Sequence, residues 1–337
     1  MYCIGIVGCG RISHSHVNAL KAMNGGELRL VACCDIIPQR ADEIAALTGA
    51  KTYTDYDVML AEEKLDLVVL CTPSGLHPAH ALKAAEAGVN ILSEKPLGTN
   101  DLESIDRAIV AADRANVLYL EVKQNRLNPP ILLLREALEA GRFGRIHQIV
   151  SNVFWARPQD YYDMAPWRGT WEMDGGCLSN QAAHYVDMVQ WMGGSVESVK
   201  AFSSTLGRRI EAEDTISVIL KFRSGAIGNI NVSVLTYPKN YEGSITVMGE
   251  KGTVRISGVA MNKIETWNFA DPHGMDSRIS EASYDPKSVY GGGHAVLYKE
   301  LPKILDGDRT SRAYVTAREG RKTVQILVKA YQDARKL

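Results

Sequence analysis

Short apolar runs alternate with stretches of helical pattern through the first third of the chain. The apolar runs are almost continuous, which is typical of strands buried on both faces of a parallel sheet. Strands that alternate with helices predict an α/β domain whose sheet is covered by helices on both faces. The predicted strands are Tyr2–Val7, Arg29–Cys34, Leu67–Cys71, Asn90–Ser93 and Val117–Val122, and the predicted helices are His14–Met23, Pro38–Thr48, Asp57–Ala61, Pro78–Ala87 and Leu102–Ala115.

The pattern changes beyond residue 124. A helix over Pro130–Ala140 ends at Gly141, which suits a left-handed cap. Extended segments separated by short turns then predict an open, mostly antiparallel sheet with helices on one face. We expect a first domain over residues 1–124 and an α+β domain over residues 125–337, whose C-terminal helix could pack back on the first. The extended segments are Ile146–Trp155, Val196–Thr205, Thr215–Phe222, Ala226–Val234, Gly243–Gly249, Gly252–Ser257 and Lys263–Asn268, with helices at Gln181–Met192 and Ala313–Leu337.

Charge, hydropathy and cysteine spacing exclude several classes of protein. The formal net charge is −1 and no basic stripe is present, so we expect no nucleic-acid partner. No stretch approaches the ~20 apolar residues that cross a bilayer, and the first residues lack signal-peptide features. Most of the six cysteines lie inside apolar runs without CxxC spacing, so we expect buried thiols and no metal site. These features together predict a cytoplasmic protein without a membrane partner.

A glycine motif directly follows the first predicted strand and precedes a helix. It reads Gly8-Cys9-Gly10-Arg11-Ile12-Ser13, with serine where the third glycine usually stands. Such a loop and the following helix N-terminus are suited to binding a pyrophosphate, so the first domain is predicted to be a Rossmann fold. Asp35 ends the second strand, 25 positions beyond Gly10, where it could accept hydrogen bonds from ribose hydroxyls. Because a carboxylate there would repel a 2′-phosphate, the sequence favours NAD over NADP.

Two further segments end predicted strands at the carboxyl edge of this sheet, where ligands bind in such folds. Thr72 and Pro73 follow the third strand, and His77 beside them could contact the cofactor or simply lie on the surface. The triplet Glu94-Lys95-Pro96 follows the fourth strand. Lys95 could be a solvated surface cation, or it could donate a hydrogen bond or carry a proton for a substrate hydroxyl.

A second polar segment follows the glycine pair Gly175-Gly176. Asn180 and His184 are four positions apart, which would place both on one face of a helix, one turn apart. Asp187, three residues further on, could orient the histidine ring. A helical histidine of this kind can equally be a hydrogen-bonded core residue.

The glycine motif, the Glu94-Lys95-Pro96 triplet and the Asn180…His184 pair, in this order, resemble the Gfo/Idh/MocA family of sugar and inositol oxidoreductases. This resemblance implies direct hydride transfer to NAD, with Lys95, His184 and Asn180 as the catalytic residues. The family commonly has aspartate where this chain has Asn180; since an amide cannot exchange a proton, acid–base work would fall to His184 and Lys95 in exchangeable roles. The implied cofactor-binding residues are Gly8, Gly10, Arg11, Ile12, Asp35, Thr72, Pro73, His77, Glu94, Lys95 and Gln124.

A narrower resemblance concerns three other segments, 123–130, 160–170 and 290–294. They look similar to the UDP-N-acetylglucosaminuronate 3-dehydrogenases of bacterial surface-polysaccharide synthesis. Arginine forks would suit the pyrophosphate and carboxylate of such a substrate, and the glycines before His294 could form an anion nest or a flexible loop. The implied substrate-binding residues are Lys95, Asn125, Arg126, Arg157, Tyr162, Trp167, Arg168, Asn180, His184, Tyr290 and His294.

Several alternatives stay open at this point. The same fold could act on an inositol or a free aldose, hydrolyse glycosides through transient oxidation, or serve as a non-enzymatic NAD sensor. The presence of both Lys95 and His184 argues against a sensor. NADH could leave after each cycle or be reoxidised in place by 2-oxoglutarate. One face of the second sheet needs a cover, so we expect a homodimer or homotetramer formed through it.

Overall fold

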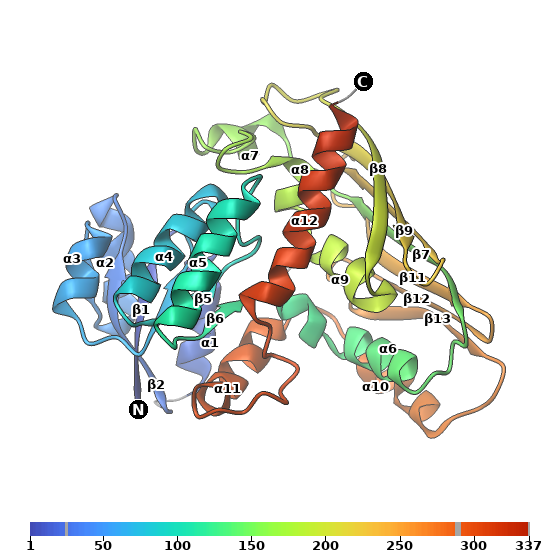
Figure 1. Cartoon of the computed structure of the whole chain (residues 1–337), viewed down its shortest axis with the longest axis horizontal. Helices are drawn as coiled ribbons and strands as arrows, with labels where there is room; N and C mark the ends of the chain where they lie inside the picture. Colours follow the sequence, from blue (N-terminus) through green and yellow to red (C-terminus); the bar gives the residue numbers. More distant parts are fainter. Residues whose placement is uncertain (24–25, 287–290, 336–337) are drawn as a thin grey trace. The chain divides into compact units, whose positions relative to one another are not determined.

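The chain folds into two compact units. The computed structural model describes residues 1–23, 26–286 and 291–335 (Figure 1). Unit 1 comprises Met1–Lys123 and His294–Arg321, and unit 2 comprises Gln124–Gly293 and Lys322–Leu337. The sequence predicted a single division after residue 124, whereas residues 294–321 return to unit 1. A backbone hydrogen bond of 2.9 Å from the Glu121 amide to the Val315 carbonyl joins the returning segment to the sheet of unit 1.

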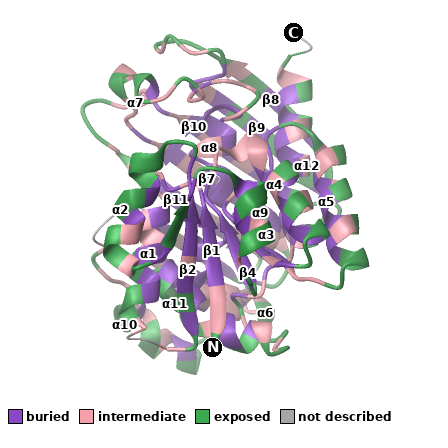
Figure 2. Cartoon of the chain, turned by 90° about the vertical axis from the view of Figure 1, so that its left-hand side faces the viewer, coloured by how far each residue is buried: buried purple, intermediate pink, exposed green. Residues whose placement is uncertain are grey.

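Unit 1 contains a six-stranded sheet in the order β3-β2-β1-β4-β5-β6, in which all neighbouring strands are parallel. All four residues of β4 are buried, as expected for a strand covered on both faces. Figure 2 shows β1 and β2 as largely buried, next to helices with exposed outer residues. The predicted α/β Rossmann architecture is confirmed. The strands are β1 (Tyr2–Val7), β2 (Leu28–Cys34), β3 (Lys51–Tyr53), β4 (Leu67–Leu70), β5 (Asn90–Ser93) and β6 (Tyr119–Glu121).

Local signals set the bounds of several helices in unit 1. Asp101 accepts hydrogen bonds from the Glu103 and Ser104 amides and so caps the start of α5. Gly49 adopts a left-handed conformation at the end of α2. The edge strand β3 escaped the sequence analysis because it has only three residues, two of them exposed. The helices are α1 (Ser13–Ala22), α2 (Pro38–Thr48), α3 (Tyr56–Glu62), α4 (His77–Glu86), α5 (Leu102–Arg114) and α11 (Gly293–Leu305), with a 3₁₀ turn η1 (Ser74–Leu76).

Unit 2 contains a seven-stranded sheet in the order β13-β12-β11-β7-β10-β9-β8. Only the pair β7 and β10 is parallel among these neighbours, so the predicted open, mostly antiparallel sheet is confirmed. Buried and exposed residues alternate along β9, which shows that one face of the sheet is packed and the other is open. The strands are β7 (Ile146–Phe154), β8 (Val196–Ser204), β9 (Thr215–Phe222), β10 (Ile227–Ser233), β11 (Glu242–Gly249), β12 (Gly252–Ser257) and β13 (Lys263–Phe269).

The packed face of this sheet carries the core of unit 2. Apolar residues of β7, β9, β10 and β11 form one cluster with side chains of α6, α9 and the last part of α12, including Leu327 and Tyr331. Among the described residues, no helix is both long and apolar enough to cross a membrane. The helices are α6 (Pro129–Glu139), α7 (Gln159–Asp163), α8 (Gly176–Asn180), α9 (Ala183–Gly193), α10 (Ile279–Ala282) and α12 (Ala317–Ala334), with 3₁₀ turns η2 (Gln124–Leu127) and η3 (Gly274–Arg278).

Candidate active site

The glycine loop of unit 1 joins the end of β1 to the start of α1. Gly8 has φ +86°, and an added Cβ there would lie 2.6 Å from the carbonyl carbon of Cys71, so only glycine fits. At Gly10 an added Cβ would meet no atom within 4 Å. Ser13, in place of the third glycine, donates a 2.6 Å hydrogen bond to the Gly10 carbonyl and holds the loop. The open backbone at Gly10 fits the close approach of a pyrophosphate.

Asp35 lies at the end of β2, where the sequence predicted a ribose-binding carboxylate. Its Oδ2 accepts a 2.8 Å hydrogen bond from the Cys9 amide, and its Oδ1 accepts a 2.9 Å bond from the Ile37 amide. Asp35 therefore connects the glycine loop to the second strand as well as presenting a carboxylate there. Of the two other loop residues predicted to bind cofactor, Arg11 is exposed and Ile12 is half-buried.

The carboxyl ends of three neighbouring strands, β1, β4 and β5, lie along one edge of the sheet of unit 1, which we call the ligand edge. Val7 pairs with Leu70 and Leu70 with Ser93, which aligns the glycine loop, the Thr72–Pro73 segment and the Glu94–Lys95 turn along it. Thr72, Pro73 and Lys95 are half-buried, and the Lys95–Pro96 peptide bond is cis.

His77 connects two of these segments. Its Nδ1 lies 2.7 Å from the Pro96 carbonyl oxygen, and its Nε2 lies 2.8 Å from the Thr72 carbonyl oxygen. Since carbonyl oxygens only accept, each ring nitrogen that carries a proton donates to one of these two loops. His77 is 1% exposed, and burial lowers its pKa. His77 was predicted either to contact the cofactor or to lie on the surface. In the structure it is buried between the Thr72 and Pro96 segments of the ligand edge.

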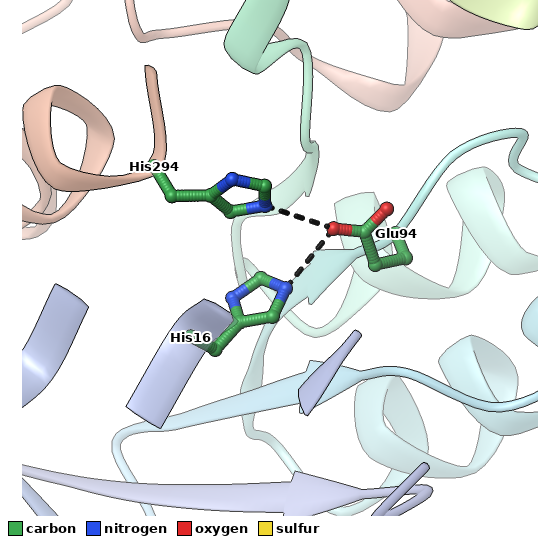
Figure 3. Close-up of side chains that lie close together, drawn as sticks. All are labelled: His16, Glu94 and His294. Atoms are coloured by element: carbon green, nitrogen blue, oxygen red, sulfur yellow. Dashed lines mark hydrogen bonds and ion pairs between the residues drawn. The ribbon is translucent and has the colours of Figure 1, made fainter. Parts of the chain in front are cut away.

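Glu94 lies at the centre of a buried polar cluster (Figure 3). Its Oε1 accepts hydrogen bonds from His16 Nε2 at 3.0 Å and from His294 Nε2 at 3.4 Å, and its Oε2 accepts one from the Lys95 amide at 3.2 Å. Glu94 is 4% exposed, His16 0% and His294 6%. Burial raises the pKa of Glu94, but the hydrogen bonds from the two histidines outweigh it and hold the pKa well below its usual range.

The same three side chains are, within residues 1–23, 26–286 and 291–335, the one group that could share a metal ion, with ligand atoms within 4.8 Å of one another. Hydrogen bonds already account for their arrangement. His294 was predicted to bind substrate, and the sequence carried no signal that it would meet Glu94, 200 positions away. Tyr290 lies outside the described residues.

The polar segment of unit 2 begins at the glycine pair. Gly175 and Gly176 have φ +78° and +88°, and a Cβ added at Gly176 would lie 1.8 Å from Oε2 of Glu213. The four-residue spacing predicted that Asn180 and His184 lie on one continuous helix, and this prediction was wrong. Helix α8 ends at Asn180, and α9 begins at Ala183.

The break between α8 and α9 has a local cause. The amides of Gln181 and Ala182 both donate to the Cys177 carbonyl, at 3.0 and 3.1 Å, and Ala182 leaves the helical region with φ −102° and ψ 3°. The two side chains therefore belong to separate helices. His184 lies in the first turn of α9 and is 7% exposed.

Asn180 is held by a neighbouring carboxylate. Its Nδ2 donates to Asp174 Oδ1, and Asp174 Oδ2 accepts a 2.7 Å hydrogen bond from the Gly169 amide. Asp174 is 1% exposed. The bond fixes the amide orientation of Asn180, because a carboxylate can only accept and the Nδ2 group must face it. The role of Asp174 was not found from the sequence.

The arginines predicted to bind substrate have different surroundings in unit 2. Arg126 is 4% exposed and forms a bidentate ion pair with Asp187, with Nε–Oδ2 at 2.7 Å and Nη2–Oδ1 at 2.8 Å. Arg157 and Arg168 are half-buried. Their guanidinium carbons lie 5.5 and 4.3 Å from the centre of the Tyr161 ring. Such stacking restrains the guanidinium plane. Nη1 of Arg157 also donates to the Ala156 carbonyl at 2.8 Å and to Asn240 Oδ1 at 3.1 Å.

The remaining predicted residues of unit 2 are also placed. Arg168 stacks on Trp167 at 4.7 Å, and Tyr162 is buried, which raises its pKa. Gln124 and Asn125, in η2, are buried. A Cβ at Gly293 would lie 2.0 Å from the Gln124 carbonyl oxygen, so this glycine allows close packing of two backbones.

Comparison with known proteins agrees with these observations. Residues 3–123 match the oxidoreductase family with an NAD-binding Rossmann fold, and residues 131–255 match the GFO/IDH/MocA C-terminal domain. The myo-inositol 2-dehydrogenase of Thermotoga maritima is 30% identical over 260 residues, which cover 74% of each chain.

Two solved structures are similar over almost the whole chain. The WlbA dehydrogenase from Bordetella pertussis, in complex with NADH and UDP-GlcNAcA, is 49% identical with a TM-score of 0.95, covering 99% of this chain and 96% of that one. The WlbA dehydrogenase from Chromobacterium violaceum, with the same ligands, is 46% identical with a TM-score of 0.94, covering 99% and 94%. The chain therefore belongs to the Gfo/Idh/MocA family and is an NAD-binding oxidoreductase.

Proposed function

We propose that this enzyme oxidises the C3 hydroxyl of a UDP-N-acetylhexosaminuronic acid in the synthesis of a bacterial surface-polysaccharide sugar. The observation that carries the proposal is the 49% identity, over 99% of this chain, to a dehydrogenase whose complex holds NADH and UDP-GlcNAcA. A second observation supports it. The chain has a lysine at the ligand edge of unit 1 and an asparagine and histidine at adjacent helix ends of unit 2, which are groups suited to oxidising an alcohol.

Three side chains would carry the protein's part of the reaction. Bound NAD supplies the hydride acceptor. His184 removes the hydroxyl proton, and Lys95 donates a hydrogen bond to the developing alkoxide, where charge stabilisation is most effective. Asn180 cannot exchange a proton, so it orients the hydroxyl, and Asp174 holds its amide in one orientation. Lys95 and His184 can exchange roles in this scheme because both side chains can take up and release a proton.

The nucleotide-sugar substrate carries a pyrophosphate and a carboxylate, so its recognition needs donors. In this proposal Arg157 and Arg168 bind the substrate, since both are half-buried and stacked on Tyr161; Arg157 does so in addition to its bonds to Ala156 and Asn240. Arg126 already directs two nitrogens at Asp187. Further contacts are proposed from Asn125, Tyr162, Trp167 and Tyr290, whereas His294 Nε2 already donates to Glu94.

The proposal is tested by absorbance at 340 nm after mixing the protein and NAD with UDP-N-acetylglucosaminuronic acid. Parallel samples contain myo-inositol or glucose, each with and without 2-oxoglutarate as a hydride acceptor. NADH formed with the nucleotide sugar alone, and lost in Lys95→Ala and His184→Ala variants that still bind NAD, supports the proposal. A response to myo-inositol alone would assign the chain to the chemistry of its Thermotoga maritima relative instead.

The open face of the sheet in unit 2 supports a homo-oligomer. Phe202 and Ile219 are 71% and 49% exposed on β8 and β9, beside polar side chains such as Ser217 and Asn231. We propose that a second copy covers this face in a homodimer or homotetramer. The six free cysteines fit a reducing compartment, and we place the reaction in the cytoplasm. Light scattering of the purified protein would measure the oligomeric state.

A further inference from the structure

We propose that three buried histidines, His16, His77 and His294, are positioning residues for Lys95. They contact the turn Glu94–Lys95–Pro96 at the residue before the lysine and at the residue after it. None of them needs to touch the reacting atoms. The inference rests on the catalytic role of Lys95 in the proposed function and goes beyond it by naming the groups that hold that lysine.

The first contact is made through the Glu94 side chain. Its Oε2 accepts a hydrogen bond from the Lys95 amide at 3.2 Å. Its Oε1 accepts hydrogen bonds from Nε2 of His16 at 3.0 Å and from Nε2 of His294 at 3.4 Å. The carboxylate therefore links the histidines of α1 and α11 to the main chain of the lysine by hydrogen bonds. Figure 3 shows both rings directed at the same oxygen from different helices.

The tautomer of His16 follows from its partners. A carboxylate oxygen only accepts, so Nε2 of His16 carries a hydrogen. Burial lowers the pKa of His16, and in the neutral ring Nδ1 accepts from the Tyr298 hydroxyl 2.9 Å away. Every polar atom of this ring has a defined partner, which leaves it one orientation.

The second contact is made on the other side of the lysine. Nδ1 of His77 lies 2.7 Å from the Pro96 carbonyl oxygen, and Nε2 lies 2.8 Å from the Thr72 carbonyl oxygen. Glu94 thus bonds the Lys95 amide, and the His77 ring lies within hydrogen-bond distance of the carbonyl that follows Lys95. A neutral ring has one N–H and donates to one of the two carbonyls. Lys95 itself is half-buried at the ligand edge, whereas the three histidines are all buried.

The chemical nature of the cluster argues for positioning rather than simple core filling. Burying a carboxylate is unfavourable unless hydrogen bonds compensate for the lost water, and apolar residues of similar volume are often at least as stabilising. Directional bonds instead fix geometry, and a displacement of about 1 Å in a catalytic group can cost on the order of 100-fold in rate. The polar cluster is therefore better suited to setting the place of Lys95 than to adding stability.

The test compares three replacements of His294 in the NAD-bound enzyme. Glutamine places an amide N–H close to the position of the histidine Nε2, whereas asparagine and alanine do not reach Glu94. We expect kcat to fall at least about tenfold in His294→Asn and His294→Ala and to recover to within about threefold in His294→Gln. The KM for the sugar and the Kd for NAD should change by less than about threefold in all of them. Val296→Ala is the matched control, because Val296 lies in the same helix and is 39% exposed.

A second readout does not depend on turnover. The acylation rate of Lys95, followed by mass spectrometry in the NAD-bound protein, should change in His294→Asn and return in His294→Gln. If the wild type oxidises another polyol instead of the nucleotide sugar, the proposed substrate is wrong. The kinetic comparison of the His294 variants is then made with that polyol. If no substrate is oxidised, the acylation rates decide.

Three outcomes would overturn the positioning role. They are unchanged kcat and acylation in a folded His294→Ala protein, a glutamine variant as impaired as the asparagine variant, or a rate loss explained wholly by weaker NAD binding. One equivalent of zinc per chain, lost in His294→Ala, would also overturn it and make the cluster a metal site.

Discussion

The carboxyl group of Glu213 gives unit 2 a calculable dependence on pH. Glu213 is 2% exposed, and its Oε1 accepts hydrogen bonds from the Leu178 amide at 2.9 Å and the Tyr331 hydroxyl at 3.0 Å. Burial raises its pKa from 4.5 to about 7. The folded protein therefore binds this proton more tightly than the unfolded chain does. The stability that Glu213 contributes is complete below pH 4.5 and is lost as the pH rises to about 7.

The size of the effect follows from the shift. A shift of one pKa unit corresponds to about 1.4 kcal/mol, so the rise from 4.5 to about 7 amounts to roughly 3 kcal/mol of unfolding free energy. The substitution Glu213→Gln keeps an acceptor for Leu178 and Tyr331 but cannot titrate. Any cost of burying its amide is the same at every pH. The unfolding free energy of the variant minus that of the wild type should therefore rise by roughly 3 kcal/mol between pH 4.5 and pH 8.

Urea unfolding followed by tryptophan fluorescence measures this difference. The Trp171 ring lies 5.1 Å from the ring of Tyr331, which bonds Glu213, so the signal reports on this region. The Glu213→Asp variant is a control, because it keeps a titratable carboxyl. Parallel stability curves for the wild type and Glu213→Gln across this pH range would refute the reasoning and mean that the buried carboxyl titrates normally.

Three further predictions concern other parts of the chain. Asp35→Ser should lower the ratio of kcat/KM for NAD to that for NADP by at least about tenfold, since the carboxylate that repels a 2′-phosphate is removed. Gly8→Ala should destabilise the protein by about 1–3 kcal/mol because of its positive φ and the nearby Cys71 backbone; an unchanged melting temperature would contradict this. Arg126→Ala should cost about 3–5 kcal/mol by leaving Asp187 buried without its ion-pair partner, and a double variant Arg126→Met, Asp187→Leu should recover part of that loss in thermal unfolding.

Local sequence patterns determined the architecture of unit 1 and its cofactor. Nearly continuous apolar runs are required by strands buried on both faces, and the glycine loop needs residues without a Cβ at a sharp turn. The sequence therefore predicted the places of Gly8 and Gly10 in the loop after the first strand and of Asp35 directly after the second strand. The mostly antiparallel sheet of unit 2 followed in the same way from alternating segments and tight turns. Each of these signals lies within about 10–30 consecutive residues, which is the range over which such patterns act.

The tertiary structure alone decided which polar side chains meet. Glu94 bonds His16 and His294, which are 78 and 200 positions away, and Arg126 bonds Asp187, 61 positions away. No local pattern encodes such pairs, because they depend on where separate elements pack. The break between Asn180 and His184 was missed for a different reason, because their spacing fits a helix. The amides of Gln181 and Ala182 share the Cys177 carbonyl, and α8 ends at Asn180. Residue types revealed the chemistry, and long-range hydrogen bonds decided how those residues are held.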